Sequence, residues 1–167
     1  YSFSKAFRLT GHRVGAMLTS PSFLAEAEKF LDTVTICPSQ IGQYSALWGL
    51  QNMTDWLAQE RLEILARRAA IEENMPTLQA QGWKLKGCGA YFAYLEHPFD
   101  MSSDELAPRM VKEAGVLALP GTMFMPQDDP DAARHLRIAF ANIDSAGITE
   151  LFSRLSRLRF SLAPSPA

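Results

Sequence analysis

The spacing of apolar residues changes once along this chain of 167 residues, and that change constrains the fold more than any other feature. Between residues 39 and 75 they recur at intervals of three and four, which predicts one bent helix or two consecutive helices. After Pro76 and Gly82 the interval becomes two, in residues 83–86 and again in residues 90–95. The change predicts paired strands, which a tight turn or bulge at the Gly-Cys-Gly of residues 87–89 would join.

Shorter patterns complete the order of elements. They predict a strand over residues 14–18, a helix from residue 22 to about 31, a brief β-branched run over 34–36, a helix over 105–114, a run over 116–119, a strand over 135–141 and a helix over 144–160. Candidate N-caps precede three of these helices: Ser20 or Ser22, Ser102 or Ser103, and Asp144. A helix-rich half followed by β-β-α-β-α predicts a small α+β unit with helices on one face of a short sheet, and a frayed tail over residues 163–167.

Composition excludes several classes of protein. Sixteen Lys and Arg against eighteen Asp and Glu give a net charge of -2, so we expect no general attraction to nucleic acid or to an anionic membrane. No run approaches the roughly 20 apolar residues of a membrane span, and a cytoplasmic protein fits best. The two cysteines and three histidines are scattered, so we expect no metal site, no disulfide framework, and surface or locally hydrogen-bonded histidines.

The chain opens at Tyr1, without a methionine, in a dense run of aromatic and small polar residues. Such an opening is typical of the end of a buried strand, whereas natural domains begin in exposed polar linkers. We therefore expect this chain to be part of a longer protein.

Lys5 is the strongest candidate for chemistry. A neutral lysine amine can form a Schiff base with an aldehyde. The nearby hydroxyls of Ser2 and Ser4 can donate to phosphate oxygens, and the guanidinium of Arg13 can bind them through two parallel hydrogen bonds. One small molecule that carries both an aldehyde and a phosphate is pyridoxal phosphate.

Residues 2–15, SFSKAFRLTGHRVG, resemble the S-x-S-K-x-x-x-x-x-G-x-R-x-G lysine motif of the class I and II aminotransferases, which are fold type I pyridoxal-phosphate (PLP) enzymes. By that resemblance Lys5 forms the internal aldimine and is the catalytic proton carrier, while Ser2, Ser4 and Arg13 bind the cofactor phosphate. A surface lysine beside a strand end is the alternative, which the spaced motif disfavours.

Residues 135–142, HLRIAFAN, resemble the family strand whose arginine binds the substrate α-carboxylate, and Arg137 would take that role. The alternative is a strand arginine that pairs with a surface acid. Relatives that prefer dicarboxylates place a second arginine in the region of residues 35–43. This chain has none there, which argues against aspartate as the preferred donor.

The resemblance covers essentially this whole chain, but only the last part of such an enzyme. It implies the small C-terminal domain at residues 76–167, with a mainly antiparallel sheet, after a linking helix region at 39–75 and the trailing part of the large cofactor-binding domain at 1–38. Most large-domain cofactor contacts would then lie outside residues 1–167, so we expect this segment alone to be inactive. The family also implies a homodimer.

The activity implied is transfer of an amino group from an amino acid to a 2-oxo acid. Two alternatives stay open at this point. A fold type I lyase or decarboxylase shares the lysine motif, and a transcription regulator can use an aminotransferase-like domain to sense a ligand.

Overall fold

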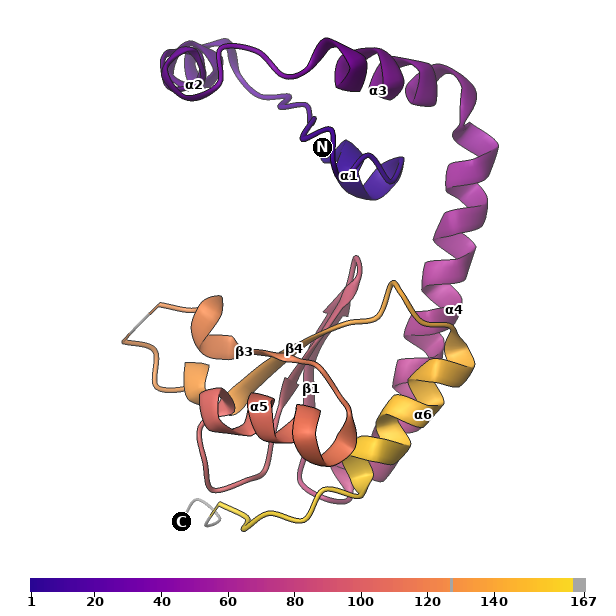
Figure 1. Cartoon of the computed structure of the whole chain (residues 1–167), viewed down its shortest axis with the longest axis vertical. Coiled ribbons are helices and arrows are strands. Elements are labelled where there is room, and N and C mark those ends of the chain that lie inside the picture. Colours follow the sequence, from indigo (N-terminus) through magenta and orange to yellow (C-terminus); the bar gives the residue numbers. More distant parts are fainter. Residues whose placement is uncertain (127, 164–167) are drawn as a thin grey trace. The chain divides into compact units, whose positions relative to one another are not determined.

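The computed structural model describes residues 1–126 and 128–163 (Figure 1). The chain divides into two compact units, Tyr1–Arg61 and Leu62–Ala167. In the described residues, no helix is both long and apolar enough to cross a membrane. Residues 164–167 of the predicted frayed tail lie outside the described part of the chain.

Helices dominate the first unit. They are α1 (Phe3–Ala6), α2 (Pro21–Val34), α3 (Gln40–Asn52) and the beginning of α4 (Thr54–Gln79). The Ser20 hydroxyl caps α2 by accepting a hydrogen bond from the Phe23 amide at 3.3 Å, as one of the two predicted caps required. The small hydrophobic core of the first unit contains Phe3, Phe7, Val14 and Ala46.

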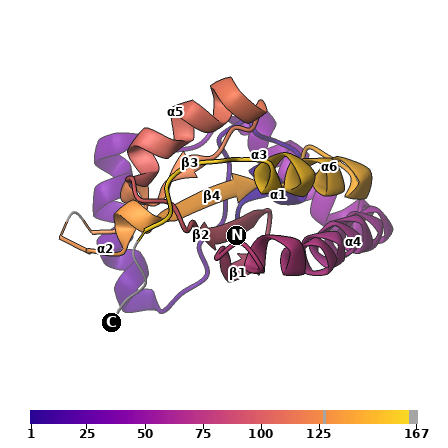
Figure 2. The same cartoon turned by 90° about the horizontal axis from the view of Figure 1, so that it is seen from below.

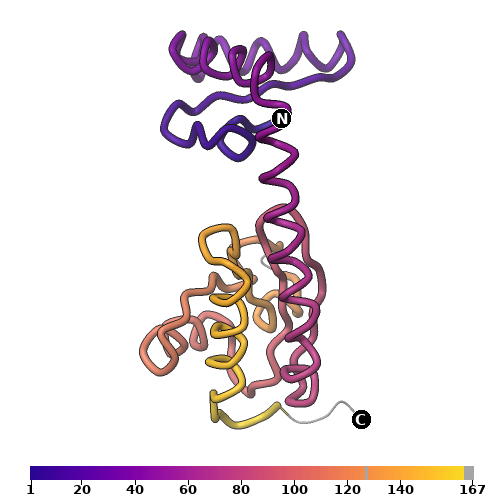
Figure 3. The backbone as a smooth tube through the Cα atoms, turned by 90° about the vertical axis from the view of Figure 1, so that its right-hand side faces the viewer, coloured from indigo at the N-terminus to yellow at the C-terminus, as the bar shows by residue number. Residues whose placement is uncertain are grey.

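Two consecutive helices, α3 and α4, follow residue 39, which confirms one of the two predicted arrangements. The second of them continues past Pro76 to Gln79, one turn beyond the predicted end (Figure 3). A proline inside a helix removes one backbone hydrogen bond, but burial of Met75 and Leu78 in the core on either side of it offsets that loss.

The strand predicted over residues 14–18 is wrong. Only a single bridge forms there, between Ser2 and Gly15, and the opening residues form α1 instead of a strand end. The β-branched run at 34–36 is not a strand either, because α2 continues through Val34. The backbone of residues 1–3 lies alongside residues 14–16, but it turns into α1 at Phe3, so the pairing does not extend into a strand.

The second unit is built on a four-stranded antiparallel sheet in the order β1-β2-β4-β3. Its strands are β1 (Lys84–Gly89), β2 (Phe92–Glu96), β3 (Leu119–Pro120) and β4 (His135–Ala139). Of the run predicted at 116–119, only Leu119 lies in a strand, and it forms β3 together with Pro120.

The glycines at 87 and 89 lie inside β1 and not in the turn. The register shifts between Leu85 and Gly87, so the predicted bulge is present. The chain reverses after it, through Ala90, whose φ is +48°, and Tyr91. The predicted site of the turn is therefore wrong by a few residues.

Helices cover one face of the sheet, as predicted (Figures 1 and 2). On that face Ala93 pairs with Ile138 and Leu95 with Leu136, and all four side chains are buried. They share one core with α4, α5 (Ser103–Ala114) and α6 (Ser145–Ser156). The last helix ends at Ser156, four residues before the predicted end.

The side chains that alternate with these form the second face of the sheet. They are Phe92, Tyr94, His135 and Arg137, and Tyr94 pairs directly with Arg137 across the two strands. A short 3₁₀ turn, η1 (Gly121–Met123), follows β3 and contacts β4. This second face is polar and aromatic, in contrast to the aliphatic first face.

Candidate active site

The two ends of the lysine motif are joined by backbone hydrogen bonds. The Phe3 amide donates to the Val14 carbonyl at 3.3 Å, and the Ala16 amide donates to the Tyr1 carbonyl at 2.8 Å. A β-carbon on Gly15 would lie 2.9 Å from the Tyr1 carbonyl oxygen, so only glycine permits this approach. The motif thus forms a closed loop, in which residues 14–16 lie beside residues 1–3.

Within this loop Arg13 contacts Ser4. Its Nη1 donates to Ser4 Oγ at 3.4 Å and to the Thr10 carbonyl at 3.0 Å. The Ser4 side chain is buried, whereas Arg13 is exposed and has a left-handed backbone with φ of +50°. The structure therefore brings together two of the three predicted phosphate-binding residues.

Lys5 is adjacent to Ser4 in α1 and is exposed. Ser2, the N-cap residue of the same helix, is also exposed, and its carbonyl accepts from the Lys5 amide at 3.2 Å. The amine, two hydroxyls and the guanidinium thus belong to one local segment. Their chemistry fits an anion with an aldehyde next to it, which is the donor set that pyridoxal phosphate requires.

Packing beneath α1 fixes this segment. Phe7 and Phe3 stack at 5.8 Å between ring centroids, and both are buried. Gly49 of α3 makes room for Phe7, since a β-carbon there would lie 2.8 Å from the ring. Arg8 stacks on Trp56 and pairs with Glu60, so its charge is already compensated within the first unit.

Arg137 belongs to the second unit, on the second face of the sheet. Its guanidinium carbon lies 3.7 Å from the centroid of the Phe124 ring and 4.3 Å from that of Phe92. Within residues 1–126 and 128–163 it forms no ion pair, which argues against the alternative of a strand arginine paired with a surface acid. The arginine is held by rings and not by a carboxylate.

Two further polar side chains belong to the same face, the half-buried Tyr94 and the buried His135. Tyr94 and His135 stack at 5.0 Å, and neither the Tyr94 hydroxyl nor either ring nitrogen of His135 has a hydrogen-bond partner in the described residues. Burial, with the nearby Asp129 carboxylate, raises the pKa of Tyr94. His135 was expected at the surface or locally hydrogen-bonded, and it is neither.

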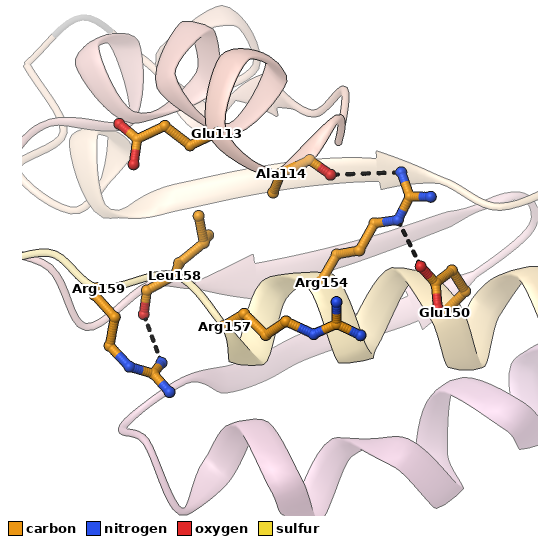
Figure 4. A pocket seen from close by; sticks show the side chains of 7 residues that line it. All are labelled: Glu113, Ala114, Glu150, Arg154, Arg157, Leu158 and Arg159. Carbon is orange, nitrogen blue, oxygen red and sulfur yellow. Dashed lines mark hydrogen bonds and ion pairs between the residues drawn. The ribbon is translucent and has the colours of Figure 1, made fainter.

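A basic pocket lies elsewhere in the second unit, between the ends of α5 and α6 (Figure 4). Its three arginines already donate hydrogen bonds within the protein. Arg154 donates to the Glu150 carboxylate and to the Ala114 carbonyl. Arg157 donates to the Ser153 hydroxyl, and Arg159 donates to the carbonyls of Ser156 and Leu158. Two of them donate to carbonyls at the carboxyl ends of α5 and α6, where positive charge is favourable. We assign no site to this pocket.

Sequence reasoning missed Phe92 and Phe124 as neighbours of Arg137. The period of two could have placed Phe92 on the same face, because it lies two residues before the partner of Arg137 in the sheet. No local pattern marks Phe124, which reaches the arginine from the loop after β3.

Known proteins match this chain over most of its length. The model of the family described as aminotransferase class I and II matches residues 1–155. An aromatic-amino-acid aminotransferase of Thermococcus litoralis is 32% identical over 125 residues, which are 73% of this chain and 32% of that protein. An aspartate aminotransferase of Pyrococcus abyssi is 31% identical over the same shares. The chain thus spans about a third of the length of these curated relatives.

Solved structures agree with the sequence matches. The aromatic aminotransferase of Pyrococcus horikoshii superposes with a TM-score of 0.74 at 26% identity, over 93% of this chain and 40% of that one. A mutant aspartate aminotransferase of Thermus thermophilus gives a TM-score of 0.72 at 25% identity, over 91% and 40%. The predicted fold class, that of the fold type I aminotransferases, is confirmed, and this chain belongs to the class I and II aminotransferase family.

Proposed function

We propose that this chain is the C-terminal part of a PLP-dependent aminotransferase that moves an amino group from an amino acid to a 2-oxo acid. The observation that carries the proposal is the loop of residues 1–16, which joins Arg13 to Ser4 and presents Lys5 in the same segment. Family membership over residues 1–155 supports it. One structural relative, from Streptococcus suis, is itself described as PLP-dependent.

In the proposed site, Ser2, Ser4 and Arg13 hold the phosphate of the cofactor. Two hydroxyls and a planar guanidinium can donate several charge-assisted hydrogen bonds to one phosphate. The Lys5 amine would hold the cofactor aldehyde until the amine of the substrate displaces it, and the released Lys5 amine would then take and return the proton of the substrate α-carbon. The bound cofactor supplies the electron sink that lets this proton leave.

Arg137 binds the α-carboxylate of the amino acid in this proposal. A guanidinium that meets a carboxylate through two parallel hydrogen bonds fixes its orientation, and hence the direction of the α C–H bond. The lack of an ion pair on Arg137 in the described residues supports the assignment, because the donors of a carboxylate site must be available to the substrate.

The three-part organisation is also proposed: residues 1–38 as the trailing part of the large domain, 39–75 as the linking helix region and 76–167 as the small domain. The break between α2 and α3 supports the first of these boundaries. Dimerisation, a cytoplasmic location and the inactivity of the isolated segment stay predictions.

The test uses the full-length gene product, loaded with PLP and given single amino acids without an oxo acid. We expect loss of the visible absorbance of the lysine-bound cofactor, with release of the matching 2-oxo acid. Lys5→Ala should slow this half-reaction by about 10²-fold or more, since it removes the proton carrier. Lys29→Ala, at an exposed lysine of α2 paired with Glu26, is the matched control and should react like the wild type.

Other outcomes point elsewhere. Loss of the carboxylate or side chain of the amino acid would favour the lyase or decarboxylase alternative. An unchanged spectrum with every donor would contradict the transaminase proposal and favour a ligand-sensing domain. Equal rates in Lys5→Ala and wild type would refute the assignment of Lys5.

A further inference from the structure

The guanidinium of Arg137 contacts two aromatic rings. Its central carbon is 3.7 Å from the centroid of Phe124 and 4.3 Å from that of Phe92. Cation–π attraction acts at both distances. The two rings therefore hold the guanidinium, and within the described residues no carboxylate pairs with it.

The two rings come from elements of different character. Phe92 begins β2, and its backbone pairs with Ala139 of β4, so the sheet fixes its position. Phe124 follows the η1 turn, outside any strand or long helix. One of the two rings is thus positioned by the sheet and the other by a loop.

Specific contacts anchor that loop. The Thr122 hydroxyl donates to the Asp104 carboxylate at 2.9 Å, which ties η1 to the first turn of α5. The Phe124 amide donates to the Gly121 carbonyl at 2.8 Å. Gly121 itself has no room for a side chain, since a β-carbon would lie 2.5 Å from the Ala132 carbonyl oxygen. These contacts fix the backbone of the turn that carries Phe124, and the Phe124 ring, which is 43% exposed, contacts Arg137 from there.

We propose that Phe124 and Phe92 are positioning residues that form an aromatic clamp on Arg137 and hold its guanidinium in place for a carboxylate. A free arginine side chain samples many rotamers, and each must be given up when a carboxylate binds. An arginine held in plane beforehand loses less freedom on binding, so its affinity for a carboxylate is higher. This inference rests on the proposed function, in which Arg137 receives the α-carboxylate.

The experiment uses the PLP-loaded full-length gene product and two readouts. The first is the dissociation constant of hexanoate, a monocarboxylate without an amino group, measured by calorimetric titration. The second is the pair of steady-state constants for the best amino acid donor. Hexylamine, which lacks the carboxylate, serves as the comparison ligand for both wild type and variants.

We expect Phe124→Leu to weaken hexanoate binding about tenfold and to raise KM for the amino acid by a similar factor, with a smaller change in kcat. Phe92→Leu should act in the same direction. Phe124→Tyr keeps the aromatic face and should restore binding to within about twofold of wild type. Met123→Leu, at the exposed neighbour on the same turn, is the matched control and should bind hexanoate normally.

Three outcomes would overturn the clamp. In the first, Phe124→Leu, Phe124→Tyr and Met123→Leu bind hexanoate equally. In the second, hexylamine and hexanoate lose affinity together, which indicates general damage to the fold. In the third, Arg137→Ala binds hexanoate as tightly as the wild type does. If Phe124→Leu does not fold, the Phe124→Tyr and Phe92→Leu pair still gives the comparison.

Failure of the proposed function is a separate result. A wild-type protein that converts no amino acid contradicts the aminotransferase proposal, whatever the variants do. Hexanoate binding that depends on both Arg137 and Phe124 would still support the clamp in that case.

Discussion

His97 is a titratable side chain fully enclosed in the core of the second unit. It is 0% exposed, contacts the rings of Trp83 and Phe99, and its Nε2 is 3.3 Å from the Ala133 carbonyl oxygen. Burial above all, together with the positive charge of Arg134, lowers the pKa of His97 to about 4. The sequence predicted a surface or locally hydrogen-bonded histidine; the hydrogen-bonding alternative holds, and the surface one does not.

This burial makes the stability of the second unit depend on pH. In the unfolded chain the His97 imidazole takes up a proton near pH 6.5, whereas in the folded protein it takes up a proton only near pH 4. The free energy of unfolding should therefore fall by about 3 kcal/mol as the pH drops from 6.5 to 4, and should not change further from this source below pH 4. Urea unfolding at a series of pH values measures the slope.

The variant His97→Gln removes this titration. Its unfolding free energy should lie below that of the wild type at pH 7.5 and fall less steeply between pH 6.5 and 4. Above pH 7 the two proteins should show parallel curves, which serves as the internal control. The same slope in both proteins over the acid range would show that His97 is not the group responsible.

Residues of the site differ in how far the sequence could predict them. Ser4, Lys5 and Arg13 lie within one short motif, so their proximity follows from local spacing and from glycine at position 15. Phe124 is thirteen residues before Arg137 in the chain, and its ring arrives through loop packing that no periodic pattern encodes. Contacts within a motif are predictable, while contacts made by a loop on a sheet depend on the assembled fold.

At the scale of elements, α5 is the most completely specified helix. Ser102 Oγ accepts from the Glu105 amide at 3.3 Å, and Glu105 accepts in return from the Ser102 amide at 3.3 Å, which completes a capping box. Gly115, with φ of +64°, ends the helix in the left-handed region. Both ends were predictable because caps are chosen by side chains within a few residues of each other.

Removing this cap should cost a measurable amount of stability. We expect Ser102→Ala to lower the free energy of unfolding by about 1 kcal/mol, because the Glu105 amide at the start of α5 loses its accepting hydroxyl. Ser102→Thr keeps an accepting hydroxyl and should lie within a few tenths of a kcal/mol of the wild type. Urea midpoints compare the three proteins, and equal loss in the Ala and Thr variants would contradict a capping role.

Strand ends were less predictable than helix ends, for a physical reason. The turn between β1 and β2 uses Ala90 at positive φ, a conformation usually taken by glycine, while the glycines one and three residues before it lie in β1. Pairing decides a strand, and the pairing partner is distant in sequence. The isolated bridge between Ser2 and Gly15 shows the same dependence, since the β-like run after it has no partner strand.

At the scale of the whole molecule, the two units differ in how they bury apolar side chains. The second unit has a continuous core that unites the sheet with α4, α5 and α6. The first has a small core around Phe3 and Phe7. In particular α2 buries none of its fourteen residues, and Phe23, Phe30 and Val34 are each more than half exposed.

Amide hydrogen exchange on the chain of residues 1–167 should separate these helices. An isolated helix of fourteen residues is marginally stable in water, so the amides of α2 should exchange nearly as fast as those of an unfolded peptide. The matched comparison is α6, which is shorter but buries Ile148, Phe152 and Leu155 and should be protected by several kcal/mol. In the full-length gene product, α2 should gain protection if a further part of that protein covers its apolar side chains. The contrary outcome is that α2 is protected as strongly as α6 in the chain of residues 1–167 alone. Residues 1–167 would then stabilise α2 without a further partner. That result would contradict the assignment of residues 1–38 to a larger domain.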